Sequence, residues 1–130
     1  MKNIPKISAT AEITVSENEL AVTVGSGSLK VFSTPCMVAL MEKASCMCIA
    51  EYMEDDETTV GTEMNVKHIS ATPMGMKVTA EAILTEVNDN REFVFKVRAY
   101  DEVCLIGEGT HKRFLVNGEK FTQRTYSKIK

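Results

Sequence analysis

The apolar residues of this chain follow two patterns, one helical and one extended. Residues 31–50 read VFSTPCMVALMEKASCMCIA, and Glu42 and Lys43 are the only charged residues among them. A helix that is apolar on nearly all sides is buried rather than laid on a surface. The sequence therefore predicts a central buried helix over residues 35–53, with Thr34 as its N-cap and a proline in its first turn.

Alternation of apolar and polar residues predicts strands on both sides of this helix. The expected strands cover residues 11–15 and 20–24 before the helix, and 59–69, 77–87, 92–100 and 103–116 after it. Most of the later strands are linked by short turns, which join antiparallel neighbours. The polar and basic tail from Asn117 is expected to be partly loose.

Strands, one long helix and four more strands predict an α+β protein of the hotdog type, in which an antiparallel sheet wraps around one central helix. We expect a single domain over residues 1–130, with its core at about 8–116. One small sheet cannot cover every side of so apolar a helix. We therefore also expect a homodimer, or a larger oligomer, with the substrate cleft at or near the subunit boundary.

Composition narrows the function classes. The chain has 130 residues, of which 44% are hydrophobic and 25% charged, as in an ordinary soluble protein. No apolar run reaches the roughly 18 residues of a membrane span, and the N-terminus lacks the apolar stretch of a signal peptide. A net charge of -3 gives no reason to bind nucleic acid. The four cysteines form no CxxC pair, so we expect reduced thiols and a cytoplasmic location.

Three polar residues are candidates for chemistry: Thr34, Glu42 and His68. By strand parity His68 shares a face with Met64 and Val66, and so points towards the helix. Each residue also has a structural explanation, as an N-cap, a solvent-reaching carboxylate and a core histidine respectively. Together, however, a hydroxyl, a carboxylate and an imidazole are the groups that nucleophilic or water-activating catalysis uses.

A rival nucleophile is Cys36, because a thiol in the first turn of a helix can have its pKa lowered. Three of the four cysteines lie in the predicted helix, where cysteine commonly acts as a small buried hydrophobe. A packing role for Cys36 is therefore the simpler interpretation.

Four motifs carry a resemblance to a known family. They are T-P before the Glu-bearing helix, V-G-T before the histidine strand, H-x-x-A-T-P-x-G after it, and G-E-G-x-H later. Over about residues 31–116 the chain resembles the hotdog-fold thioesterases related to fluoroacetyl-CoA thioesterase. The resemblance implies that Thr34, Glu42 and His68 are catalytic. It also implies that Gly61 lies beside the thioester and that Arg113, or Lys112, lies near the substrate.

The implied function is hydrolysis of a small or short-chain acyl-CoA, with the thioester carbonyl at the N-terminus of the helix. Coenzyme A is then part of the substrate, and no other cofactor and no metal is expected. The family's phenylalanine-bearing lid is not repeated in residues 25–33, GSGSLKVFS, so selectivity for fluoroacetyl-CoA is not implied. Two alternatives remain: a non-catalytic acyl-CoA-binding or regulatory module, and an enoyl-CoA hydratase, whose Asp/His helix signature is absent from residues 36–53.

Overall fold

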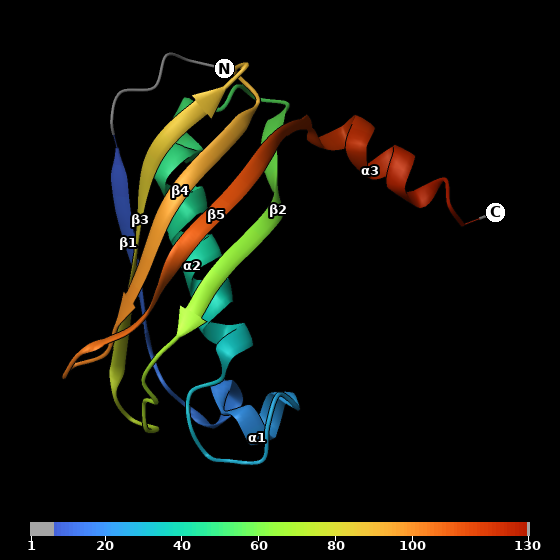
Figure 1. Cartoon of the computed structure of the whole chain (residues 1–130). Coiled ribbons are helices and arrows are strands. Elements are labelled where there is room, and N and C mark those ends of the chain that lie inside the picture. The colour runs from blue at the N-terminus through green and yellow to red at the C-terminus, as the bar shows by residue number, and fades with distance from the viewer. Residues whose placement is uncertain (1–6, 130) are drawn as a thin grey trace.

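One antiparallel sheet and one long helix make up the body of the protein (Figure 1). The structure, a computed structural model, describes residues 7–129. The strands are β1 (Ser8–Thr14), β2 (Glu57–His68), β3 (Lys77–Asn88), β4 (Glu92–Tyr100) and β5 (Leu105–Asn117). The helices are α1 (Ala21–Val24), α2 (Thr34–Ile49) and α3 (Gly118–Tyr126), with short 3-10 turns at Glu17–Glu19 and Ala50–Tyr52. This is the hotdog arrangement that the sequence predicted.

The N-terminus of α2 differs from the prediction in one residue. Ser33, not Thr34, is the N-cap, and its side chain accepts a hydrogen bond from the Cys36 N–H at 3.3 Å. Thr34 is instead the first residue of the helix, followed by Pro35. Because Ser33 satisfies the backbone donor, the Thr34 hydroxyl is left for other contacts.

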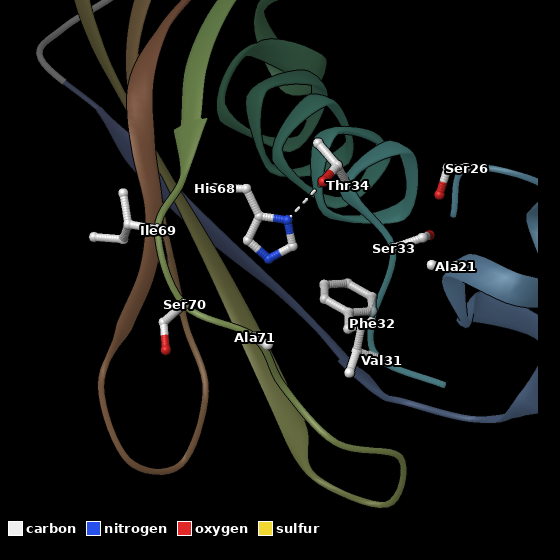
Figure 2. Close-up of a pocket in the computed structure, with 10 residues that line it drawn as sticks. All are labelled: Ala21, Ser26, Val31, Phe32, Ser33, Thr34, His68, Ile69, Ser70 and Ala71. Atoms are coloured by element: carbon white, nitrogen blue, oxygen red, sulfur yellow. Dashed lines mark hydrogen bonds between the residues drawn. The ribbon is translucent and has the colours of Figure 1, made fainter. Parts of the chain in front are cut away.

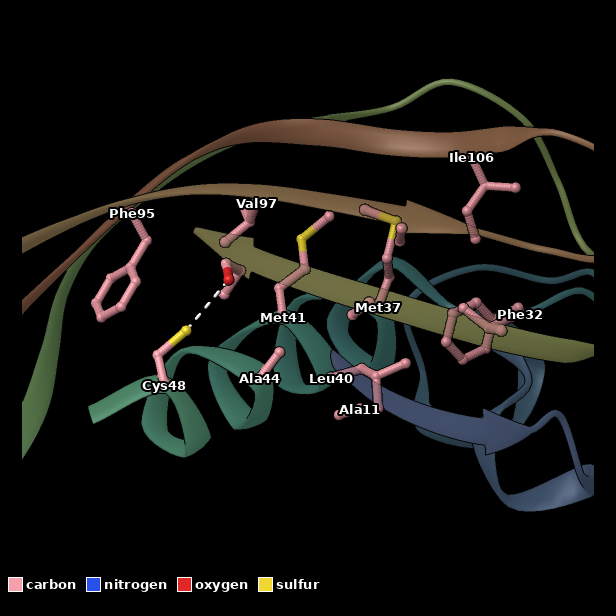
Figure 3. Close-up of a cluster of buried hydrophobic side chains, with 14 of the residues drawn as sticks. Ala11, Phe32, Met37, Leu40, Met41, Ala44, Cys48, Phe95, Val97 and Ile106 are labelled. Carbon is pink, nitrogen blue, oxygen red and sulfur yellow. Dashed lines mark hydrogen bonds between the residues drawn. The ribbon is translucent and has the colours of Figure 1, made fainter. Parts of the chain in front are cut away.

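Helix α2 buries one face against the sheet. Met37, Met41 and Ala44 are fully buried on this face, within the cluster drawn in Figure 3. Gly107 on β5 permits the close approach, because a Cβ there would lie 2.6 Å from the sulfur of Met37. On the other side, Met47 is 49% exposed. Burial on nearly every side, which the sequence predicted, therefore does not hold within one protomer.

The strand order is β1-β3-β4-β5-β2, so β2 pairs with β5 and not with β3, its neighbour in the chain. The antiparallel pairing expected across short turns is confirmed for β3 with β4 and for β4 with β5. Between β2 and β3, residues 69–76 instead carry the chain across the sheet. Strand β2 thus becomes an edge strand. Met64, Val66 and His68 are partly buried on one of its faces, whereas Thr62 is exposed because the register shifts between Gly61 and Glu63.

One further expectation is wrong. Residues 20–24 form no strand: Leu20 makes a single bridge to Phe32, and the next four residues form α1, which ends at Gly25 in the left-handed conformation. In the tail, which was expected to be partly loose, Asn117 caps α3, and this helix points away from the sheet (Figure 1). Among the helices of residues 7–129, none is both long and apolar enough to cross a membrane.

Candidate active site

A first polar cluster lies where β2 ends beside the first turn of α2. The Thr34 hydroxyl oxygen and His68 Nδ1 are 2.7 Å apart and share a hydrogen bond, drawn in Figure 2. Both side chains line a cavity of about 310 Å³ whose walls come from the loop before α2 and from the residues after β2. The fold therefore joins two of the predicted site residues, which are 34 positions apart in the sequence.

The other nitrogen of His68 is unoccupied. Nε2 is buried, and no group among the described residues forms a hydrogen bond with it. Burial lowers the pKa of His68 below its ordinary value of 6.5, and a backbone contact to Ser70 opposes that shift. At neutral pH the imidazole is therefore neutral, with one nitrogen held by Thr34 and one nitrogen free to take a proton.

Glu42 belongs to a second cluster, between the side of α2 and strand β2. Its carboxylate lies against Gly61, where an added Cβ would be only 2.8 Å from Glu42 Oε2. The carboxylate also pairs with Arg113, at 3.4 Å between Oε2 and Nη1. The Glu42 side chain is 40% exposed, whereas that of Arg113 is 9% exposed. A carboxylate that still reaches solvent is thus held beside a nearly buried cation.

Thr59 on the neighbouring strand β2 holds the Arg113 side chain in place. Its Nε donates to the Thr59 hydroxyl at 2.9 Å, and its Nη2 donates to the Thr59 carbonyl oxygen at 3.0 Å. Lys112 points the other way and pairs with Glu63 at 3.9 Å. Of the two basic residues that the resemblance offered, Arg113 is the one placed in the cluster.

The sequence reasoning missed a residue of this cluster, His111. It is 1% exposed, and its Nε2 lies 3.2 Å from Arg113 Nη1. Burial lowers its pKa, as does the charge of Arg113, whereas the Glu63 backbone and Glu42 act in the opposite direction. Strand parity was the available signal, because alternate residues of β5 put His111 on the same face as Arg113.

The helix N-terminus offers fewer free donors than expected. The Ser33 N–H donates to the Glu19 carbonyl at 2.9 Å, the Cys36 N–H is held by the Ser33 side chain, and Pro35 has no N–H. In the described part of the chain, the Thr34 N–H is the donor left without an acceptor in this turn. Cys36 lines a different cavity, between α2 and β1, and not the one that holds His68.

Within a single chain the two clusters stay apart. Glu42 follows Thr34 by eight residues, which is about 12 Å along a helix at 1.5 Å per residue. No hydrogen bond joins Glu42 to Thr34 or His68 in the residues that the structure describes. Of the three candidates, Thr34 and His68 therefore line one cavity, and Glu42 lies in the second cluster.

Comparison with known proteins agrees with this architecture. A family model described as fluoroacetyl-CoA-specific thioesterase matches residues 15–119. The fluoroacetyl-CoA thioesterase of Streptantibioticus cattleyicolor is 41% identical over 99 residues, which cover 76% of this chain and 70% of that protein. A solved fluoroacetyl-CoA thioesterase structure superposes with a TM-score of 0.90 at 32% identity, covering 100% of this chain and 99% of the other.

A crystal structure with lower sequence identity has a similar fold. It is a thioesterase superfamily member from Thermus thermophilus, with a TM-score of 0.88 at 25% identity over 98% of this chain and 94% of that one. With the sheet and central helix described above, these matches define a hotdog-fold thioester hydrolase. More narrowly, the chain belongs to the fluoroacetyl-CoA-specific thioesterase family. The prediction of an enzyme that hydrolyses small acyl-CoA thioesters is confirmed.

Proposed function

We propose that Thr34, Glu42 and His68 carry out this hydrolysis, with Gly61 and Arg113 binding the thioester group. The observation that supports the proposal most is the Thr34–His68 pair, because its imidazole is neutral, oriented at Nδ1 and free at Nε2. That combination is what a general base needs before substrate arrives.

The proposed steps balance as an ordinary acyl transfer to water. His68 Nε2 takes a proton from the attacking water as the new C–O bond forms. The C–S bond then breaks, and the imidazolium returns the proton to the leaving thiolate of coenzyme A. In this scheme His68 Nδ1–H donates to the Thr34 hydroxyl, so Thr34 orients the ring and does not attack.

Glu42 acts as the second acid/base, or as a nucleophile that forms a transient anhydride with the acyl group. The two roles differ in whether the acyl group becomes bonded to the enzyme. Mass spectrometry of the Glu42 peptide after rapid quenching during turnover finds the added mass of the acyl group if an anhydride forms there. If Glu42 moves only protons, the peptide keeps its unmodified mass throughout turnover.

Developing negative charge on the thioester oxygen needs donors that are already in place. Gly61 allows the substrate to approach the backbone of β2, because it has no side chain to intervene. Arg113 supplies a nearly buried positive charge in the same place. Since the first turn of α2 keeps few free N–H groups, this second cluster is the stronger candidate for stabilising the oxyanion.

The two clusters must therefore serve one substrate, and we propose that a homodimer brings them together. Strand β2 lies at one edge of the sheet, with β5 as its single neighbouring strand among the described residues, and an edge strand can pair with another chain. If β2 pairs antiparallel with its own copy about a two-fold axis, the His68 end of one strand lies beside the Gly61 end of the other. Each site then combines Thr34 and His68 of one protomer with Glu42, Gly61 and Arg113 from the second copy.

Selectivity for a fluorinated acyl group does not enter the proposal. Phe32, the single phenylalanine before α2, is 1% exposed and bonded through its N–H to the Thr72 carbonyl at 2.9 Å. A side chain fixed in the core in this way does not act as a movable lid. The physiological acyl group is therefore to be found by assay among small acyl-CoA thioesters, fluoroacetyl-CoA included.

Coenzyme A enters as part of the substrate, and we propose that hydrolysis needs no further cofactor or metal. The four cysteines are all free thiols, which fits the proposed cytoplasmic location.

The test is a thiol-release assay on acetyl-, fluoroacetyl-, propionyl- and butyryl-CoA, with enoyl-CoA hydration followed in parallel. Release of coenzyme A that is lost in a folded His68→Ala variant supports the proposal. Tight binding of acyl-CoA without release supports the non-catalytic module instead.

A further inference from the structure

His111 is a buried polar side chain with a partner at each ring nitrogen, and the proposed chemistry leaves it without a role. It lies on β5, is 1% exposed, and its ring stacks on Phe95 with the centroids 6.1 Å apart and the planes at 27°. A phenylalanine would fill such a position without the cost of burying polar nitrogens. The two ring nitrogens therefore need an explanation beyond packing.

Both nitrogens have partners, and the partners dictate one tautomer. A guanidinium group only donates, so His111 Nε2, at 3.2 Å from Arg113 Nη1, must accept and carry no proton. A carbonyl oxygen only accepts, so His111 Nδ1, at 2.8 Å from the Glu63 carbonyl, must donate. The contact to Glu63 requires a proton on Nδ1, and the contact to Arg113 requires a bare Nε2, so together they fix the neutral form with its proton on Nδ1.

The acceptor at Nε2 acts on the part of Arg113 that faces the site. Thr59 holds Nε and Nη2, while Nη1 lies between His111 Nε2 and Glu42 Oε2. An added Cβ at Gly61 would lie 3.3 Å from both Arg113 Nη1 and His111 Cε1. The nitrogen that His111 holds is thus the one beside the space where the thioester is proposed to bind.

We infer that His111 is a positioning residue that fixes Arg113 Nη1 in the direction of the thioester oxygen. A neutral acceptor suits this task better than another carboxylate, because it orients the guanidinium without neutralising its charge. The inference rests on the proposed function of Arg113. In chemical terms, the neutral imidazole of His111 keeps the Arg113 guanidinium available to the thioester oxygen, on which negative charge develops.

Two substitutions separate the roles of the two nitrogens. In His111→Gln the side-chain oxygen reaches the position of Nε2 and can still accept from Arg113. In His111→Asn the amide nitrogen takes the position of Nδ1 and can still donate to Glu63, but the acceptor for Arg113 is lost. Far-UV circular dichroism and thermal unfolding establish that both variants are folded before any rate is compared.

We expect His111→Gln to keep kcat within about threefold of wild type, and His111→Asn to lower it about tenfold or more, with a smaller change in KM. A purely structural role predicts no such difference between two variants of equal stability. Equal kcat in two folded variants therefore overturns the inference.

A double-mutant cycle with Arg113→Lys tests whether His111 acts through Arg113. Lysine cannot reproduce the fork of contacts to Thr59, so the effect of His111→Asn should largely disappear in that background. If the two substitutions lower kcat independently, so that their fold-changes multiply, His111 does not work through Arg113 and the inference is wrong.

A readout independent of activity separates this inference from the proposed function. ¹⁵N chemical shifts of the His111 ring should show a protonated Nδ1 and a bare Nε2 near neutral pH. A proton on Nε2 overturns the positioning role whatever the enzyme's rate. The proposed function fails on different evidence, namely a folded wild-type protein that releases no coenzyme A from any thioester in the panel.

Discussion

The two polar clusters differ in how many of their hydrogen bonds are already made. At the end of β2, Thr34 and His68 share one bond, and His68 Nε2 has no partner among the described residues. At the side of α2, Arg113 makes bonds to Thr59, His111 and Glu42, and His111 uses both ring nitrogens. One cluster is open to a new partner, and the other is nearly saturated.

The difference corresponds to two kinds of chemical work. A group that accepts a proton needs an unoccupied site in its neutral form; His68 Nε2 is such a site, and burial favours the neutral ring by lowering the pKa of His68. A group that stabilises charge works best when it is fixed beforehand, because it then does not reorganise during the reaction. We therefore expect changes in the first cluster to affect turnover, and changes in the second to affect turnover and stability together.

The largest effect is expected from His68→Ala. Removing the general base should lower kcat by roughly two to four orders of magnitude. Stability should change little, because His68 makes one side-chain hydrogen bond and leaves a buried nitrogen unpaired. Thiol release and thermal unfolding measure the two quantities. A folded variant with wild-type turnover places the chemistry elsewhere.

Glu42→Gln should lower kcat by a comparable factor while keeping the shape of the side chain. It also removes the carboxylate partner of Arg113, so unfolding should become easier by about 1 kcal/mol, since Glu42 is partly exposed to solvent. Glu63→Gln is the matched control, because it removes an exposed pair with Lys112 on the outer face. That control should retain both rate and stability, and an equal loss in the two variants would count against a role for Glu42.

Smaller effects are expected from two adjacent hydroxyls: loss of one lowers kcat, and loss of the other lowers stability. Thr34→Ala should lower kcat about tenfold with little loss of stability, because Thr34 orients His68 and does not cap α2. Ser33→Ala should instead cost about 1 kcal/mol of stability through the lost N-cap. Thr34→Ser keeps the hydroxyl and should stay near wild type. If Thr34→Ala unfolds more easily than Ser33→Ala, the cap has been assigned to the wrong residue.

The smallest effect concerns pH. Burial lowers the pKa of both His68 and His111 below 6.5, so in mildly acidic solution the unfolded chain binds protons that the folded protein does not. Stability should be fully present above pH 6.5 and should fall as the pH drops towards the folded-state pKa values. Thermal unfolding across this range measures the slope, and His111→Gln should flatten it.

Activity should also fall as the pH drops, because protonated His68 cannot act as a base. The acid limb of kcat/KM should have its midpoint below 6.5, because His68 stays neutral, and hence able to act as a base, at lower pH than an ordinary histidine. A midpoint at or above 6.5 contradicts the assignment of His68 as a base in an environment that disfavours its charged form.

Local sequence patterns predicted the helix, strand and turn whose formation depends mainly on residues close together in the chain. The apolar run of residues 31–50 became α2, and the alternation over 92–100 became β4 with the same bounds. A short turn was also expected between the strands at 77–87 and 92–100, and Asp89 and Asn90 there have the positive φ angles that a tight turn requires. Strand parity directed His68 inwards, towards Thr34.

What the sequence did not predict depends on contacts between distant segments. The pairing of β2 with β5 leaves β2 at the sheet edge, and no short turn marks that choice. Residues 20–24 have the apolar, β-branched composition of a strand, yet among them Leu20 alone forms a β-bridge, and Gly25 ends a helical turn instead. The second cluster depends on β5 lying beside β2, so the contacts of His111 are visible only in the tertiary structure.

Subunit complementation tests whether one active site takes residues from two protomers. His68→Ala and Glu42→Gln proteins, each nearly inactive, are mixed in equal amounts under conditions that let subunits exchange. If sites are shared, half of the dimers are mixed and each mixed dimer has one intact site, so activity should recover to about a quarter of wild type. No recovery, with mixed dimers shown to form by native mass spectrometry, would contradict a shared site.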